Sequence, residues 1–188
     1  MIRVFIGVQG SGKDFEANAM MKESPGVKIA FADEVRKMTW ELLGYEPLDE
    51  KAYDEFKKDW KIIVTSKEGK GNVMSGRKFM QVLGTDVIRK RNTNFWVDLA
   101  YQKIDEYFTM CPEDDIYITD CRFDNEAKML IDKFPGNVVF YWCNWKDAIN
   151  NMDDEHESEL FAKNIGKKDM KHLEIITESV KDFVFEIK

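Results

Sequence analysis

The sequence has few cysteines and no long apolar run. Its three cysteines, Cys111, Cys121 and Cys143, show neither CxxC nor Cys/His spacing, which argues against a disulfide framework or a structural zinc site. We expect reduced thiols in a cytosolic core. No apolar stretch approaches the roughly 20 residues that span a bilayer, and the start of the chain lacks the pattern of a signal peptide. The sequence therefore predicts a soluble, cytoplasmic protein with no membrane partner.

Positive charge is also in short supply. The chain has 28 Lys and Arg against 35 Asp and Glu, a net charge of -7. This argues against a protein that binds nucleic acid by neutralising phosphates, so no stable nucleic-acid partner is expected. Any anionic ligand must be held by local clusters of basic groups. The 188 residues, 44% of them hydrophobic, suffice for one sizeable core, and we expect a single domain over residues 1–188.

Apolar runs alternate with segments of helical spacing. Runs rich in β-branched and aromatic residues predict buried strands over 4–8, 27–31, 116–119 and 138–142. Apolar residues recur at helical spacing in the segments 15–21, 33–43, 52–62, 78–89, 96–108 and 126–133. Such alternation is typical of an α/β fold with a parallel sheet covered by helices. Two polar stretches, 66–75 and 144–159, separate these elements.

The most specific local pattern lies where the first strand should turn into the first helix. Residues 7–14 read GVQGSGKD and fit GxxxxGK, the phosphate-binding loop or P-loop. In such a loop, glycines let backbone N–H groups surround a phosphate, and the helix N-terminus adds partial positive charge. Lys13 would then bridge the β- and γ-phosphates. The alternative, a structural glycine turn, is disfavoured by the position after a buried strand. The expected ATP-binding residues are Gly10, Ser11, Gly12, Lys13 and Asp14.

Two carboxylates are candidate magnesium ligands. Asp14 stands where most P-loops place a Ser or Thr hydroxyl, so it could bind the metal directly or through water, or serve only as an acidic first-turn residue. Asp120 ends the third apolar run, where ligands bind in open α/β sheets. It would hold the metal that bridges the phosphates, or else be a solvated turn residue. Arg122 could stabilise charge on the moving phosphoryl group, while Asn125 and Glu126 could begin a helix or act in catalysis.

A basic helix is the candidate site for a second phosphate. Residues 75–89 combine an apolar stripe with polar groups on other faces. Arg77 and Arg89 could clamp an anionic acceptor, because each guanidinium offers a bidentate fork and keeps its charge. Gln81 and Thr85 could hydrogen-bond a base or a phosphate. On this segment alone, the alternative of a solvated basic helix face is favoured.

Further acceptor candidates follow the second predicted strand. Asp33 could cap a helix or contact the acceptor, and Arg36 adds a third guanidinium. Large aromatic side chains could stack on a nucleobase, although an aromatic at helical spacing belongs more often to the core. These are Trp40, Trp60, Phe79 and Trp96.

Five motifs in order resemble those of one known family. They are GxxGSGKD at the start, FAD followed by Arg36, GR-x3-Q-x2-GTD-x2-R with Trp96 after it, TDCRFDNE, and HESE over 156–159. Across about residues 2–160 the chain resembles the bacteriophage deoxynucleoside monophosphate kinase family. The resemblance implies a P-loop NTPase three-layer fold like that of adenylate kinase, with an acceptor-binding helical insert over about 34–110 and a short lid over about 144–170. It also implies ATP with Mg2+ as donor and conversion of dNMP to dNDP for phage DNA synthesis, in the host cytoplasm.

The resemblance also implies roles for residues. Catalytic positions of the family match Lys13, Asp120, Arg122 and Arg89. Acceptor-binding positions match Asp33, Arg36, Arg77, Gln81, Thr85, Asp86, Arg89 and Trp96. The chain departs from the family at Phe15, which follows Asp14 where a hydroxyl residue is common. It departs again in the lid, which holds no arginine, so that lid contacts would fall to Lys146, Lys163, Lys167 or Lys168.

This set of residues predicts in-line phosphoryl transfer without a strong general base, because an acceptor phosphate is already an oxyanion. A closing lid is expected to exclude water. The rival functions keep the P-loop: a kinase for another acceptor such as phosphomevalonate, dephospho-coenzyme A or a modified base in DNA, a non-catalytic nucleotide switch, or a structural protein with a vestigial loop. The three arginines favour a kinase over a switch. Small-molecule nucleotides are the expected partners, with a homodimer, the base preference and the deoxy-versus-ribo selectivity left open.

Overall fold

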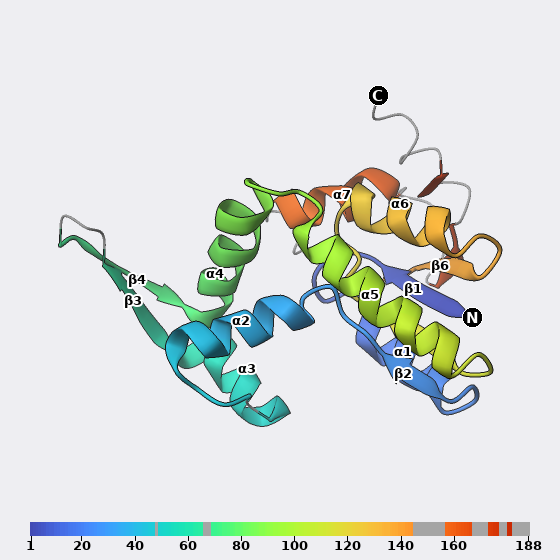
Figure 1. Ribbon diagram of the computed structural model, residues 1–188, viewed down its shortest axis with the longest axis horizontal. Coiled ribbons are helices and arrows are strands. Elements are labelled where there is room, and N and C mark those ends of the chain that lie inside the picture. Colours follow the sequence, from blue (N-terminus) through green and yellow to red (C-terminus); the bar gives the residue numbers. More distant parts are fainter. Residues whose placement is uncertain (48, 66–68, 145–156, 167–172, 177–179, 182–188) are drawn as a thin grey trace. The chain divides into compact units, whose positions relative to one another are not determined.

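The computed structural model describes residues 1–47, 49–65, 69–144, 157–166, 173–176 and 180–181 (Figure 1). It divides the chain into two compact units. The larger unit comprises Met1–Phe31 and Val97–Lys188, and the smaller unit comprises Ala32–Trp96. The chain therefore leaves the larger unit once, after Phe31, and returns to it at Val97.

The larger unit is built on a five-stranded sheet in the order β2-β5-β1-β6-β7. Four of these strands run parallel, and the edge strand β7 (Glu174–Ile175) is antiparallel to its neighbour. The parallel strands are β1 (Ile2–Ile6), β2 (Gly26–Lys28), β5 (Asp115–Ile118) and β6 (Val138–Trp142). Ile2 is in register with Ile116 on one side and with Val138 on the other, so β1 is central. The predicted α/β fold with a parallel sheet is confirmed.

Helices cover both faces of this sheet. Val4 and Ile6 pack in one core with residues of α5 (Phe95–Met110), α6 (Asp124–Lys133) and α7 (Glu157–Ile165). Phe5, which points to the other face, packs in a second core with Ala17 of α1 (Lys13–Met21). Because both faces of β1 are buried, its sequence reads as an unbroken apolar run. The unit has the three layers expected of a P-loop kinase fold (Figure 1).

A polar network around buried Asp115 joins the amino-terminal ends of β1 and β5. The Asp115 carboxylate accepts hydrogen bonds from Arg3 Nε and Ser24 Oγ, each at 2.7 Å, and lies 3.0 Å from the Met1 amino group. Burial alone would raise the pKa of Asp115, but the bonds from Ser24, Arg3 and the amino terminus bring it below the usual value. The network stabilises the amino-terminal ends of these strands, whereas the P-loop follows the carboxyl end of β1.

The smaller unit contains helices and one β-hairpin. Its elements are α2 (Asp33–Leu43), α3 (Glu50–Asp59), β3 (Lys61–Thr65), β4 (Gly71–Ser75), α4 (Gly76–Gln81) and the π-helix η1 (Val82–Arg89). Trp40, Phe56 and Ile62 form its buried core, with the Trp40 and Phe56 ring centroids 4.5 Å apart in an edge-to-face arrangement. Trp60 packs against Phe56 at 5.4 Å. These contacts place Trp40 in the core and partly buried Trp60 against it, the more common role of such aromatics.

The hairpin corrects one expectation from the sequence. The helix predicted over 52–62 ends at Asp59, and Lys61 begins a strand instead. β4 begins at Gly71, inside the polar stretch 66–75. Only Ile62 of β3 is buried, so no alternation of apolar and polar residues marks this strand in the sequence.

Candidate active site

The loop between β1 and α1 has the strand–turn–helix context that the P-loop pattern requires. Gly10 and Gly12 adopt positive φ angles of 80° and 85°, a conformation that favours glycine. A Cβ at Gly7 would lie 2.4 Å from the carbonyl oxygen of Cys143 and from Ser11 Oγ. The loop can therefore fold tightly, with its backbone close to the end of β6, only because these positions lack side chains.

The Lys13 side chain folds back over this loop. Its Nζ atom donates to the carbonyl oxygens of Gly7 at 2.6 Å and Val8 at 2.8 Å. Burial disfavours the charged form, and the nearby charge of Arg122 acts in the same direction, so that the pKa of Lys13 falls to about 8. An anion bound at the loop would therefore favour the charged form of Lys13.

Both carboxylates that the sequence predicts as metal ligands, Asp14 and Asp120, lie in the larger unit. Thr119 Oγ1 donates to Asp14 Oδ1 at 2.8 Å, so a hydroxyl from the end of β5 meets the carboxylate that stands in place of the usual P-loop hydroxyl. Asp120 Oδ1 accepts from the backbone N–H of Phe31 at 3.0 Å. In the described part of the chain, no group of three or more His, Cys, Asp and Glu side chains could hold a metal ion.

Glu159, a carboxylate on α7, links Arg122 to the P-loop. The Arg122 Nη1 atom forms an ion pair with Glu159 Oε1, and Glu159 Oε2 accepts from the backbone N–H of Gln9 at 3.0 Å. Glu126 has a different role, because its Oε2 atom accepts from the backbone N–H groups of Arg122 at 2.7 Å and Phe123 at 3.1 Å. Glu126 therefore caps the start of α6 and fixes the backbone of Arg122.

Asp33 and Arg36 pair with each other in the first turns of α2. Arg36 Nη1 lies 3.3 Å from Asp33 Oδ1, and Arg36 Nε donates to the Tyr53 hydroxyl at 3.0 Å. The guanidinium also lies over the Tyr53 ring, 4.9 Å from its centroid. This arrangement holds Arg36 in one orientation, with a side chain that is still 38% exposed.

A row of polar side chains runs along α4 and η1. Arg77, Gln81, Thr85 and Arg89 are four residues apart, and hydrogen bonds such as Lys90 N–H to Thr85 C=O make the second half of the row π-helical. The wider π turn keeps residues at this spacing closer to one line than 3.6 residues per turn would. The row runs from exposed Arg77 through half-buried Gln81 to buried Thr85 and Arg89. Arg89 Nη1 donates to the Thr93 carbonyl at 3.4 Å.

Asp86 and Trp96 differ from this row. Asp86 is exposed and its Oδ1 atom lies 3.1 Å from Lys90 Nζ. Trp96 is buried, and its indole N–H donates to the Gly84 carbonyl oxygen at 2.9 Å. Trp96 therefore supports η1 from within, while Asp86 faces solvent.

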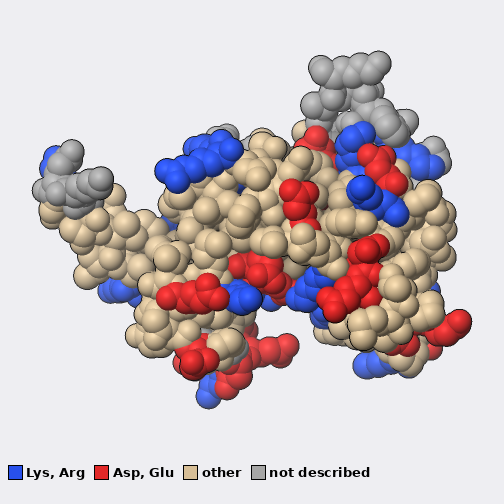
Figure 2. All heavy atoms as spheres, in the orientation of Figure 1, with Lys and Arg blue, Asp and Glu red and all other residues tan. Residues whose placement is uncertain are grey.

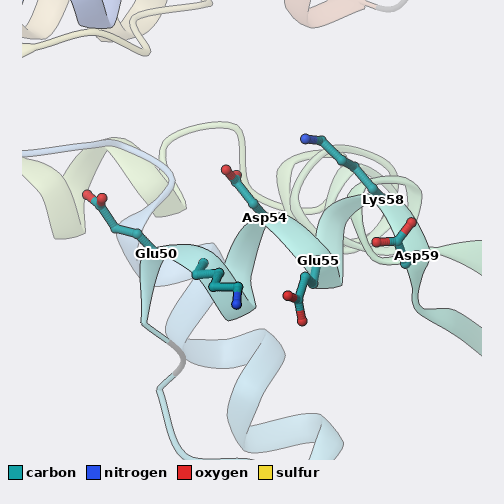
Figure 3. A pocket seen from close by; sticks show the side chains of 6 residues that line it. Glu50, Asp54, Glu55, Lys58 and Asp59 are labelled. Atoms are coloured by element: carbon teal, nitrogen blue, oxygen red, sulfur yellow. The ribbon is translucent and has the colours of Figure 1, made fainter.

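A separate hollow lies on α3 and contains none of the predicted site residues. It is lined by the charged side chains of Glu50, Lys51, Asp54, Glu55, Lys58 and Asp59 (Figure 3). All six belong to one exposed helix, and their charges are mixed. On the face that Figure 2 shows, basic and acidic side chains are likewise interspersed among the described residues.

The comparison with known families gives a clear result. A family profile described as deoxynucleotide monophosphate kinase matches residues 39–164, more than half of the chain. The chain belongs to the deoxynucleotide monophosphate kinase family. A search among curated proteins finds no match. The match includes the row on α4 and η1, Asp120 and Arg122, and it begins after the P-loop.

Membership of this kinase family confirms three predictions from the sequence: the family resemblance, the P-loop kinase-like α/β fold and the phosphotransferase class. As a kinase of this family, the protein acts on nucleotide substrates. No helix within the described ranges has both the length and the apolar character that a membrane span needs.

Two contacts around the P-loop involve side chains that the sequence did not predict as site residues, those of Thr119 and Glu159. Thr119 was not a candidate, although it directly precedes Asp120. Glu159 appeared only as the last residue of the HESE stretch. Of the predicted lid lysines, Lys163 lies in α7, whereas Lys146, Lys167 and Lys168 lie outside the described residues, as does His156.

Proposed function

We propose that this kinase transfers the γ-phosphate of ATP to a deoxynucleoside monophosphate in the presence of Mg2+, which yields a deoxynucleoside diphosphate. The strongest support is the combination of the family match with a glycine-rich loop between a buried strand and a helix. The family match supports a deoxynucleoside monophosphate as the acceptor, and the loop supports a nucleoside triphosphate as the donor.

The donor phosphates bind the backbone N–H groups of the loop, with Gly10, Ser11 and Gly12 at its centre. Lys13 turns from the carbonyl oxygens of Gly7 and Val8 to the β- and γ-phosphates. Its lowered pKa supports this step, because an added anion offsets the loss of hydration that burial imposes on the ammonium group.

Magnesium fits the residues at this end of the larger unit. The two carboxylates of Asp14 and Asp120 and the hydroxyl of Thr119 are hard oxygen donors, which Mg2+ prefers. Mg2+ usually takes one or two carboxylates and completes its shell with water and phosphate oxygens, so a small protein donor set is what a kinase needs. When bound, the ion neutralises phosphate charge. We assign Asp14, Thr119 and Asp120 as the residues that would hold it.

The acceptor binds the smaller unit, within a helical insert over about 34–110. Arg77 and Arg89 hold its phosphate, and Arg36 adds a third guanidinium once the acceptor competes with Asp33 for it. Gln81 and Thr85 lie between the two arginines along the row and contact the base or the phosphate. Asp86 and Trp96 belong to the same site at its margin, with Trp96 acting through η1.

Transfer needs no strong general base, because the attacking oxygen of the acceptor phosphate is already negatively charged. The residues that act on the moving phosphoryl group are Lys13, Asp120, Arg122 and Arg89. They stabilise charge and fix the line of attack. A lid over about 144–170 excludes water during transfer, with α7 as the part of this range that stays packed in the core of the larger unit.

The setting of this reaction is part of the proposal. A dNMP kinase supplies precursors for DNA synthesis, here in a bacteriophage-infected cell and in its cytoplasm. We expect no stable nucleic-acid binding, and light scattering on the purified protein distinguishes a monomer from a homodimer.

A coupled ADP-release assay tests the proposed function. ATP is offered with each dNMP, each NMP, phosphomevalonate, dephospho-coenzyme A and a duplex that contains a modified base, with Lys13→Ala as the inactive control. Turnover with one or more dNMPs supports the proposal. Folded protein that uses none of the nucleoside monophosphates contradicts it.

A further inference from the structure

A buried carboxylate on α7 contacts two parts of the donor site at once. Glu159 is 5% exposed. One of its oxygens accepts from the backbone N–H of Gln9 in the P-loop at 3.0 Å, and the other pairs with Arg122 Nη1. The three residues come from the P-loop, the segment after β5 and α7. Glu159 therefore links three separate stretches of chain at the place where the donor phosphates are proposed to bind.

The two charged partners differ in their access to solvent. The Glu159 side chain is 6% exposed, whereas the Arg122 side chain is 39% exposed. A guanidinium has five N–H donors, and the ion pair with Glu159 engages Nη1. Burial of a carboxylate is unfavourable unless it is paired. The contacts with Arg122 and with the Gln9 N–H therefore stabilise Glu159 in its buried position. Arg122 is thus held on its buried side and accessible on the other.

The backbone on both sides of this ion pair is also held. Glu126 binds the N–H group of Arg122, and the Lys13 ammonium binds the Gly7 and Val8 carbonyls of the loop that presents Gln9. Arg122 and Glu159 both influence the charge of Lys13, in opposite directions. Lys13, Arg122 and Glu159 consequently form one electrostatic group at the P-loop.

We infer that Glu159 is a positioning residue for phosphoryl transfer: it holds the Arg122 guanidinium at the P-loop so that its accessible side faces the donor phosphates. Glu159 acts on the transfer step through Arg122 and does not touch the substrate. The inference rests on the proposed function. The opposite arrangement is a carboxylate that blocks the phosphate site and leaves when nucleotide binds, and it predicts effects of opposite sign.

A double-mutant cycle tests the inference. Glu159→Gln keeps the shape of the side chain but removes its charge, Arg122→Gln removes the guanidinium, and the double variant removes both. Each is assayed for kcat, for the KM of both substrates and for ADP affinity by calorimetry, with thermal unfolding as a check of folding. Glu23→Gln is the matched control, because Glu23 is exposed and follows the carboxyl end of α1.

We expect Glu159→Gln to lower kcat by about 10- to 100-fold, the scale of a misplaced catalytic group. The KM for the acceptor should change less than about twofold, and ADP should bind more weakly. The double variant should lose no more activity than Arg122→Gln alone, because Glu159 acts through Arg122. Glu23→Gln should behave as the wild type.

Three results would overturn the inference: an unchanged kcat, losses that add in the double variant, or tighter ADP binding by Glu159→Gln, which would identify a blocking carboxylate. If Glu159→Gln does not fold, Glu159→Asp takes its place, since the shorter carboxylate should still lower kcat by moving Arg122. Failure of the proposed function is separate. It would appear as wild-type protein without dNMP turnover, while the ADP affinities of the four proteins would still report on the contact.

Discussion

The two units of this kinase build their sites in different ways. In the larger unit, the proposed donor site is a loop of backbone N–H groups, with polar and charged side chains brought to it from the segment after β5 and from α7. In the smaller unit, the proposed acceptor site is a row of side chains on α4 and η1, with Arg36 on α2. Loss of one side chain should therefore disturb several partners at the donor site but only one contact at the acceptor site.

The largest expected effect is that of Lys13→Ala. Lys13 is the cation of the P-loop and is packed against its carbonyl oxygens, so its loss removes charge stabilisation from the transfer step. We expect kcat/KM for ATP to fall by about 10³-fold or more. Steady-state kinetics with a saturating dNMP measures this, and circular dichroism checks folding. A loss below tenfold would mean that the loop does not hold the reacting phosphates.

Next comes a change that affects the stability of the larger unit. Asp115→Asn removes the charge that Arg3, Ser24 and the amino terminus hold, which should cost about 2 to 3 kcal/mol of unfolding free energy at pH 7. Urea unfolding measures this loss. Hydrogen exchange should show it in β1 and β5 more than in α3.

The same network sets the response to acid. The pKa of Asp115 is lowered in the folded state, so its contribution is complete above the unfolded value of about 3.9 and is lost as the pH falls below it. Wild-type stability should therefore decline more steeply than that of Asp115→Asn between about pH 4 and pH 2. Parallel slopes for the two proteins would show that Asp115 does not carry the effect.

Arg77→Ala addresses the acceptor side. Arg77 is exposed at the start of α4, so its removal should leave the fold intact and raise the KM for the acceptor by about 10- to 100-fold, the range of a lost charge-assisted hydrogen bond. The KM for ATP should stay within about twofold. Lys78→Ala, one position along the same helix, is the matched control. Equal losses for ATP and acceptor would remove the distinction between the two sites.

The smallest effect is a pH dependence of donor binding. The pKa of Lys13 is about 8 without nucleotide, and a bound phosphate should raise it, so binding takes up a proton above that pH. ATP affinity should therefore fall by up to about tenfold per pH unit as the pH rises above 8. Calorimetry in two buffers of different ionisation enthalpy measures the proton uptake. Arg77→Ala should show the same profile, since Arg77 is proposed to bind the acceptor and not the donor.

The sequence predicted the parts of the molecule that depend on neighbouring residues. The pattern in residues 7–14 predicted a glycine turn between a strand and a helix, and the structure has that turn between β1 and α1, because such a turn is encoded locally. The apolar runs identified the parallel strands, because both faces of β1 are buried. The family resemblance rested on five short motifs that follow one another in the same order along the chain as in the family.

The remainder depends on contacts between distant residues. Thr119 and Asp14 are 105 positions apart, and Glu159 and Gln9 are 150 positions apart. No local sequence pattern therefore predicts either contact. The exposed hairpin of β3 and β4 lacks a buried stripe. The π turn of η1 changes which side chains lie on one face of the helix. Its apolar residues have the spacing of an α-helix, so the sequence does not predict the π turn.

The position of β1 has a consequence for the order in which the protein forms. β1 begins at the second residue, yet its partners β5 and β6 lie beyond residue 114, whereas the smaller unit is a single stretch from Ala32 to Trp96. Contacts between distant segments close slowly and wait for the chain to be synthesised. During translation we therefore expect the acceptor-side helices to form first, while the P-loop lacks its supporting strands until β6 has left the ribosome.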